Sequence, residues 1–208
     1  MLYKNYNNKE NQINEILWAL NITGYECKYS DPRFSKTYEY GIFREQYMTL
    51  EEYKKKYFDS SRPYTVGLLE SNMYVSNGQL QPYYALIKSL EAKGCNVIPV
   101  VAAGGSENQL KVMVKYFTNA PSYEAYLNNP LKYTNNVNAI ISMPAYGIGG
   151  NLFDNTTKYF ETAGVPVFRA VHSDYVSNEE WELSATGLPG NRSDKWWHVA
   201  IGEAQGII

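Results

Sequence analysis

Two polar side chains that directly follow a short apolar run could carry chemistry. Glu70 and Asn72 come after residues 65–69, whose sequence is TVGLL. A carboxylate that ends a buried strand loses part of its hydration, which raises its pKa and lets it exchange protons near neutral pH. A solvated loop carboxylate is the more ordinary alternative. The pattern predicts ligand contacts from Glu70 and Asn72 if 65–69 is a buried strand.

One of the two histidines lies in a comparable position. His172 follows the apolar run at 165–171. An imidazole at the end of a strand can bind a metal ion or transfer protons, although many single histidines only make structural hydrogen bonds. We predict that His172 contacts a ligand and, as a second role, a metal ion.

A glycine-rich turn follows the apolar run at 139–143. Its sequence from Tyr146 onward is YGIGG, which includes Gly149 and Gly150. Backbone amides in such a turn can approach an anion at the start of the next helix. The turn does not have the G-x-G-x-x-G spacing of a dinucleotide site, and glycine also serves simply to make a tight turn. We predict that Tyr146, Gly149 and Gly150 contact a ligand.

These residues can act together only if the fold brings them close in space, and the hydrophobic pattern predicts such a fold. Four apolar runs predict strands at 65–69, 96–101, 139–143 and 165–171, with a fifth at 199–201. Apolar residues at helical spacing predict helices near 80–90, 110–117, 123–127, 152–162 and 179–184, whereas 70–78 reads as a polar loop. Connections of this length require right-handed crossovers between parallel strands. The predicted fold is α/β, an open, mostly parallel, flavodoxin- or Rossmann-like sheet with helices on both faces, whose strand ends form one ligand-binding edge.

The first part of the chain has a different texture. Residues 1–62 form a mainly helical or extended segment, with a helix near 11–21 and an extended piece at 40–43. Thr49 and Glu52 have the spacing of a capping box that starts a helix. We therefore expect two units, this segment and an α/β domain at 63–208 that holds the ligand cleft.

Composition excludes several classes of function. The formal net charge of −2 gives no electrostatic reason to bind nucleic acid. Cys27 and Cys95 are too far apart to indicate a disulfide framework or a zinc site. No apolar run approaches the ~20 residues of a membrane span, and no signal-peptide pattern opens the chain. The chain is expected to be cytoplasmic. Its 20 tyrosines reflect either a binding surface or a biased composition.

Longer motifs resemble a known family. Residues 164–167 are GVPV, 181–188 fit W-x-x-S-x-x-G-L, and 199–207 are VAIGEAQGI. This succession resembles G-V-P-V, W-x-x-S-x-x-G-L and V-A-L-P-E-x-D-G-x-I in the cobaltochelatase large subunit and the magnesium-chelatase H subunit. Upstream, YGIF at 40–43 and RPYTVGLL at 62–69 are similar to the family's Y-G-I-Y and R-P-x-V-G segments. Gly202 and Gln205 depart from the pattern, where the family has Pro and Asp.

The resemblance implies a fragment of a subunit that binds a tetrapyrrole and houses metal insertion. Cobalt or magnesium and the tetrapyrrole would be substrates, with no covalently bound cofactor. ATP would act through partner AAA+ ATPase subunits, alongside the remainder of the large subunit. Glu203 matches the family's glutamate and is the implied catalytic residue, while Trp197 could stack on a macrocycle. The isolated fragment is expected to be inactive.

A different class of function stays open on the residues alone. The same strand-end loops would suit a small-molecule binding or sensor module built on half of a periplasmic-binding-protein-like fold. Glu203 could equally shape a turn, and Trp197 could be a core anchor. Tetrapyrrole binding discriminates the two classes.

Overall fold

The computed structural model places most of the chain. It describes residues 9–31, 40–103, 107–144, 148, 153–170 and 177–185.

One six-stranded sheet organises the chain in the order β2-β1-β4-β3-β5-β6. The strands are β1 (Tyr40–Arg44), β2 (Gln46–Met48), β3 (Tyr64–Ser71), β4 (Cys95–Ala102), β5 (Ala139–Ser142) and β6 (Val167–Arg169). The last four are parallel, whereas β1 runs antiparallel to both β2 and β4. The predicted open, mostly parallel sheet is confirmed.

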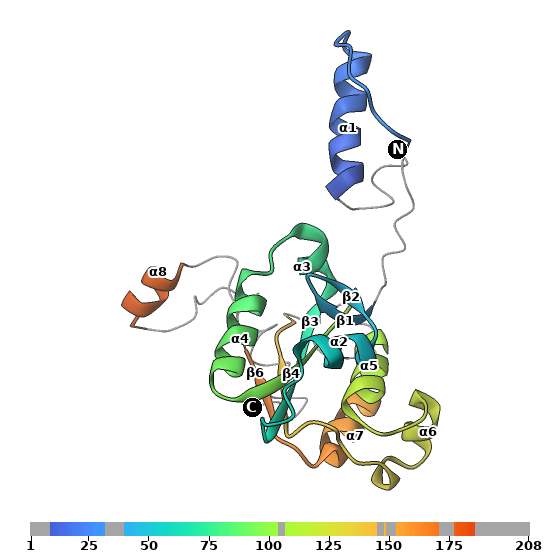
Figure 1. The fold of residues 1–208 in the computed structure, drawn as a ribbon, viewed down its shortest axis with the longest axis vertical. Helices are drawn as coiled ribbons and strands as arrows, with labels where there is room; N and C mark the ends of the chain where they lie inside the picture. Colours follow the sequence, from blue (N-terminus) through green and yellow to red (C-terminus); the bar gives the residue numbers. More distant parts are fainter. Residues whose placement is uncertain are drawn as a thin grey trace.

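Helices connect the strands and cover both sheet faces. The α-helices of the described residues are α1 (Lys9–Ile22), α2 (Leu50–Tyr57), α3 (Asn72–Asn77), α4 (Gln81–Ala92), α5 (Glu107–Phe117), α6 (Tyr123–Asn128), α7 (Phe153–Ala163) and α8 (Asn178–Leu183). Figure 1 shows α4 on one side of the strands and α5 and α7 on the other, with α1 standing away from the sheet. None of the helices in the described ranges is long and apolar enough to cross a bilayer.

Alternation along each strand divides the core in two. Leu68 and Val101 point to the face covered by α4, where they pack with Tyr83. Leu69 and Val100 point to the opposite face and join the cluster of α5 and α7. Both faces of the central strands are therefore buried, which explains why β3 and β4 read as continuous apolar runs.

The strand order reverses beside β3. The chain passes from β3 to β4 on one side, then crosses to β5 on the other side and continues to β6. This is the flavodoxin-like order 2-1-3-4, in which ligands bind beyond the carboxyl ends of the strands at the reversal point. In this sheet the reversal point lies between β3 and β5.

The antiparallel strand β1 is fixed to the rest of the fold by polar contacts. Arg44 makes a two-pronged ion pair with Glu91 of α4, with Nη1–Oε1 and Nη2–Oε2 distances of 2.5 and 3.0 Å. The Tyr83 hydroxyl donates to the Phe43 carbonyl at 2.7 Å. The capping box predicted at Thr49 and Glu52 is present and starts α2.

Four features differ from, or lie beyond, the sequence-based expectations. Residues 70–78 are not a polar loop: β3 runs to Ser71, and α3 follows, with the Ser71 hydroxyl accepting from the Met73 amide. The short strand β2 had no recognisable apolar pattern and was not expected. The strand predicted at 199–201 lies outside the described residues, and the division into units at residue 62 stays a prediction.

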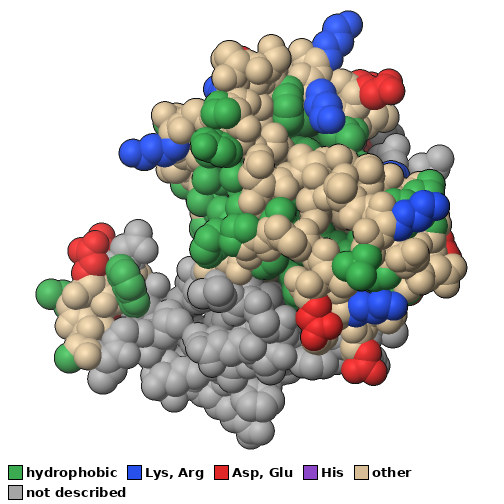
Figure 2. All heavy atoms as spheres, turned by 90° about the horizontal axis from the view of Figure 1, so that it is seen from below, with side chains coloured by type: hydrophobic (Ala, Val, Ile, Leu, Met, Phe, Trp, Pro, Cys, Tyr) green, Lys and Arg blue, Asp and Glu red, His purple; other side chains and the backbone are tan. Residues whose placement is uncertain are grey.

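Charges of both signs are spread over the surface. In Figure 2, lysine, arginine, aspartate and glutamate side chains are scattered over the coloured part of the face shown. This distribution agrees with the near-neutral composition.

A close approach between β3 and α5 makes one glycine essential to packing. A Cβ built on Gly67 would lie 2.8 Å from Cζ of Phe117, whose side chain is fully buried. The helix can therefore approach this strand only where the side chain is a hydrogen atom.

We predict that Gly67→Ala destabilises the fold by about 1–3 kcal/mol, the usual cost of overpacking a core. Urea denaturation measures this loss. Phe117→Leu frees space at the contact, so the double variant should lose less stability than the sum of the two single variants. Strict additivity would contradict the proposed contact.

Candidate functional site

The carboxyl edge of the sheet around β3 is the first candidate site. Pairing places Leu69 opposite Ser142 of β5, and Ser142 opposite Arg169 of β6. Glu70 is the next residue along β3 and therefore lies at the edge beside the reversal point. A carboxylate and a guanidinium from two different strands thus lie near the place where this fold binds ligands.

Glu70 is a buried carboxyl group with an altered acidity. Its side chain is only 2% exposed, and Oε1 accepts a hydrogen bond of 2.6 Å from the Ser71 amide. Burial raises the pKa of Glu70 to about 7, although the Ser71 amide and the charge of Arg169 act in the opposite direction. The predicted effect of desolvation on this carboxylate is therefore present.

Arg169 is half-buried at the end of β6, and the pKa of its guanidinium shifts in the opposite direction from that of the Glu70 carboxyl. Burial lowers the pKa of its guanidinium to about 10, and the charge of Glu70 only partly offsets this. Both pKa values move toward the neutral forms, so the loss of water outweighs the attraction between the two groups. Glu70 therefore holds a proton more tightly than a surface glutamate does, whereas Arg169 holds its proton less tightly than a surface arginine does.

Asn72 lies at the same edge of the sheet, as predicted, and it begins helix α3. It is the first residue of α3, half-buried, and two residues from Glu70. Its carbonyl accepts from the Ser76 hydroxyl at 3.2 Å. Glu70 and Asn72 thus both lie at this edge of the sheet. The other predicted site residues lie outside the described residues: Tyr146, Gly149, Gly150, His172, Trp197 and Glu203.

Only one residue of the glycine-rich turn after β5 belongs to the described ranges. Ile148 is buried, and its carbonyl accepts a hydrogen bond of 2.9 Å from the Thr156 hydroxyl of α7. Within the described part of the chain, no group of three His, Cys, Asp or Glu side chains is arranged to hold a metal ion.

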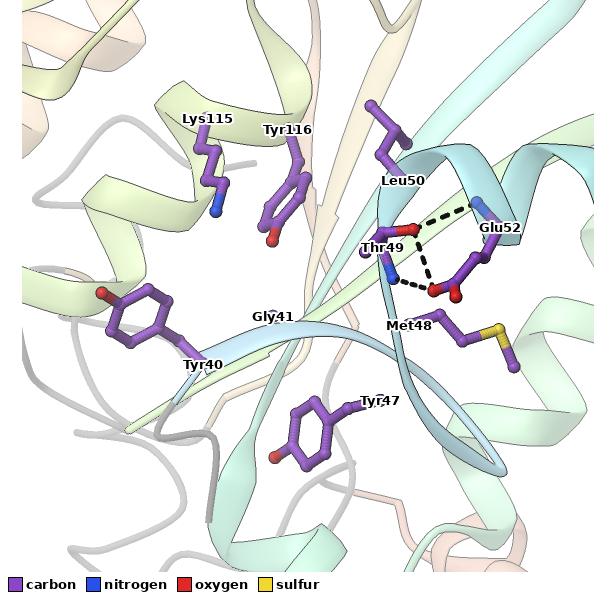
Figure 3. Close-up of a pocket in the computed structure, with 9 residues that line it drawn as sticks. All are labelled: Tyr40, Gly41, Tyr47, Met48, Thr49, Leu50, Glu52, Lys115 and Tyr116. Carbon is purple, nitrogen blue, oxygen red and sulfur yellow. Dashed lines mark hydrogen bonds between the residues drawn. The ribbon is translucent and has the colours of Figure 1, made fainter. Parts of the chain in front are cut away.

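A second candidate site is a pocket of about 920 Å³ on the other side of β4 (Figure 3). It is lined by Tyr40, Gly41, Tyr47, Met48, Thr49, Leu50, Glu52, Lys115 and Tyr116. Tyr40 pairs with Ala102 of β4, which in turn pairs with Ser71 of β3. Tyr40 therefore lies at the same edge of the sheet as the Glu70 site, two strands away from it.

Sequence reasoning missed Arg169 and this pocket. Arg169 lay within an expected strand, and only the strand order shows that it is near Glu70. The pocket combines residues from β1, β2 and α5, so no local motif marks it. The one available signal was the high tyrosine count, because tyrosines 40, 47 and 116 all line the pocket.

Relatives of known sequence cover much of this chain but are far longer. The uncharacterized protein MJ1441 of Methanocaldococcus jannaschii is 28% identical over 173 residues, which are 78% of this chain and 13% of that protein. The chloroplastic magnesium-chelatase subunit ChlH of Oryza sativa subsp. indica is 28% identical over 146 residues, 68% of this chain and 10% of that subunit. The chain thus spans only a small part of these relatives.

A solved structure shares the fold. The catalytic subunit of cobaltochelatase from Mycobacterium tuberculosis superposes with a TM-score of 0.56 over 97% of this chain and 15% of that subunit, at 13% sequence identity. At this identity the likeness concerns the fold alone.

The family assignment rests on the match between this chain and the sequence model of a protein family. The model described as CobN/Magnesium Chelatase matches residues 1–208. This agrees with the motif resemblance at both ends of the α/β region, and the chain belongs to the CobN/magnesium-chelatase family.

Proposed function

We propose that this chain forms part of the tetrapyrrole-binding cleft of a metal-chelatase large subunit. The observation that carries the proposal is the buried Glu70 carboxyl, with a pKa of about 7, at the strand-order reversal. Membership of the family supplies the reaction class, insertion of a divalent metal into a tetrapyrrole.

Metal insertion makes a specific demand on such a site. Two pyrrolic N–H bonds break and two protons leave, while all four ring nitrogens form bonds to the divalent ion as it loses its water. A general base is most effective when its pKa is close to the working pH. In this role Glu70 accepts one pyrrolic proton, and Arg169 stabilises the unprotonated carboxylate beforehand.

The finer parts of the proposal follow the family pattern. We propose a corrinoid precursor as the tetrapyrrole and cobalt as the metal, within cobalamin biosynthesis in the cytoplasm; protoporphyrin and magnesium are the other family pair. ATP would be hydrolysed by AAA+ partner subunits. Glu203 stays the predicted catalytic residue, with Tyr146, Gly149, Gly150, His172 and Trp197 as predicted ligand contacts. The isolated chain is expected to bind but not to metallate its ligand.

The acidity of Glu70 predicts how stability depends on pH. The folded protein holds this proton more tightly than the unfolded chain, whose carboxyl has a pKa near 4.5. Its stabilising contribution is therefore fully present below pH 4.5 and is lost as pH rises through about 7. The pKa difference corresponds to roughly 3 kcal/mol.

We predict that urea denaturation at a series of pH values shows this loss of stability and that Glu70→Gln removes most of it. Glu161→Gln, at an exposed position on α7, is the matched control and should keep the wild-type pH dependence. Equal pH profiles for wild type and Glu70→Gln would show that the carboxyl is an ordinary solvated one.

Tetrapyrrole binding tests the proposed function itself. Titration of protoporphyrin IX or a metal-free corrinoid with the protein should shift the ligand's main absorption band, and Trp197→Ala or Glu203→Ala should weaken binding by about tenfold through lost stacking or polar contact. Trp18→Ala, on α1, is the control tryptophan and should bind like wild type. An unchanged spectrum together with binding of a sugar or amino acid would instead support the sensor-module alternative.

A further inference from the structure

The pocket between β1, β2 and α5 has properties of its own that the metal-insertion proposal does not use. Its volume of about 920 Å³ lies near the upper end of the usual range for small-molecule sites, about 300–1,000 Å³. Two chain segments far apart in sequence form it: Tyr40 to Glu52 on one side, and Lys115 and Tyr116 of α5 on the other.

Aromatic rings provide much of the wall. Tyr116 is 8% exposed and Tyr40 is 37% exposed, so one ring is fixed in the core while the other is partly open to solvent. Tyr47 is half-buried, and it packs edge-on against Phe43, with ring centroids 5.0 Å apart. Rings with an apolar face and a polar hydroxyl suit a planar, conjugated ligand.

Gly41 lies between two of these rings. Gly41 has φ of +156°, and a Cβ there would lie 3.5 Å from Cδ1 of Tyr47 and 4.0 Å from the Tyr116 hydroxyl. A larger side chain would therefore project between the two tyrosines. The bare backbone of β1 forms that part of the pocket, as Figure 3 shows.

Two charged side chains line the pocket, those of Glu52 and Lys115, and of these the Lys115 ammonium can pair with a ligand. Glu52 is occupied by its own helix start: its Oε2 accepts from the Thr49 amide and from the Thr49 hydroxyl, both at 2.9 Å. On α5, Lys111 is paired with Glu107 at 2.9 Å. Lys115 makes no ion pair with any carboxylate in the described ranges, and its ammonium lies 5.1 Å from the centroid of the Tyr116 ring.

We propose that this pocket binds a planar conjugated molecule that carries a carboxylate. The tyrosine rings contact the faces and edges of the conjugated ring, and Lys115 pairs with the carboxylate at the mouth. Tyr40, Ala102 and Ser71 are neighbours across adjacent strands. The pocket therefore lies two strand spacings, about 10 Å, from the Glu70 site along the same edge of the sheet. Binding here requires neither a metal ion nor a tetrapyrrole.

Fluorescence titration with pyrenecarboxylate tests the site directly, with pyrenylmethylammonium as the probe of opposite charge. The carboxylate should bind and the ammonium should bind at least several-fold more weakly. Lys115→Gln should weaken carboxylate binding by up to about fivefold, the effect of losing a partly exposed ion pair. Lys115→Arg should restore it, and Lys88→Gln on the exposed surface of α4 should have no effect.

The aromatic wall is tested separately. Tyr40→Ala should weaken binding by about tenfold, whereas Tyr40→Phe keeps the ring and should bind like wild type. The proposal is overturned if pyrenecarboxylate does not bind, if both probes bind equally, or if Lys115→Gln behaves like Lys88→Gln. A protoporphyrin IX response that persists in Lys115→Gln and Tyr40→Ala would come from the proposed cleft and not from this pocket. Failure of pyrenecarboxylate to bind therefore removes this site alone, whereas loss of the tetrapyrrole response with intact pyrenecarboxylate binding removes the proposed function alone.

Discussion

The parallel pairing of β3 with β4 on one side and β5 on the other is the constraint on which the molecule depends. Eight residue pairs join β3 to β4, and four join β3 to β5. With helices on both faces, the central strand has no contact with water along most of its length. Polar residues at its end must therefore lie where the apolar core meets the carboxyl edge of the sheet, and Glu70 is in that position.

Desolvation is the physical source of the site's chemistry. Water is lost from both Glu70 and Arg169, and their attraction does not compensate, because the pKa of the carboxyl rises and that of the guanidinium falls. Glu70 is buried and Arg169 is half-buried, and charged groups whose attraction does not offset their lost hydration add little to stability. In the proposed function, the two groups would instead serve ligand or proton binding.

The sequence predicted the scaffold better than the sites. Apolar runs identified the four parallel strands because buried parallel strands have a dense β-branched signature, and the extended piece expected at 40–43 is β1. The short strand β2 lacks that signature, and it pairs with β1 through a tight turn at Glu45, a residue type that does not mark a turn with positive φ. Glu70 was recognisable because it follows an apolar run directly. Its neighbour Arg169 and the tyrosine pocket depend on strand order and on the packing of α5, which no local pattern encodes.

The two candidate sites share one edge of the sheet but depend on different physics, desolvation at Glu70 and aromatic contact with one cation at the pocket. The acidity of Glu70 is the more decisive of the two for the proposed function. Carbon-13 NMR of the labelled Glu70 carboxyl, followed from pH 4 to 9, measures it without any ligand. The account predicts a titration midpoint near 7; a midpoint near 4.5, the value of an unperturbed glutamate, would contradict it.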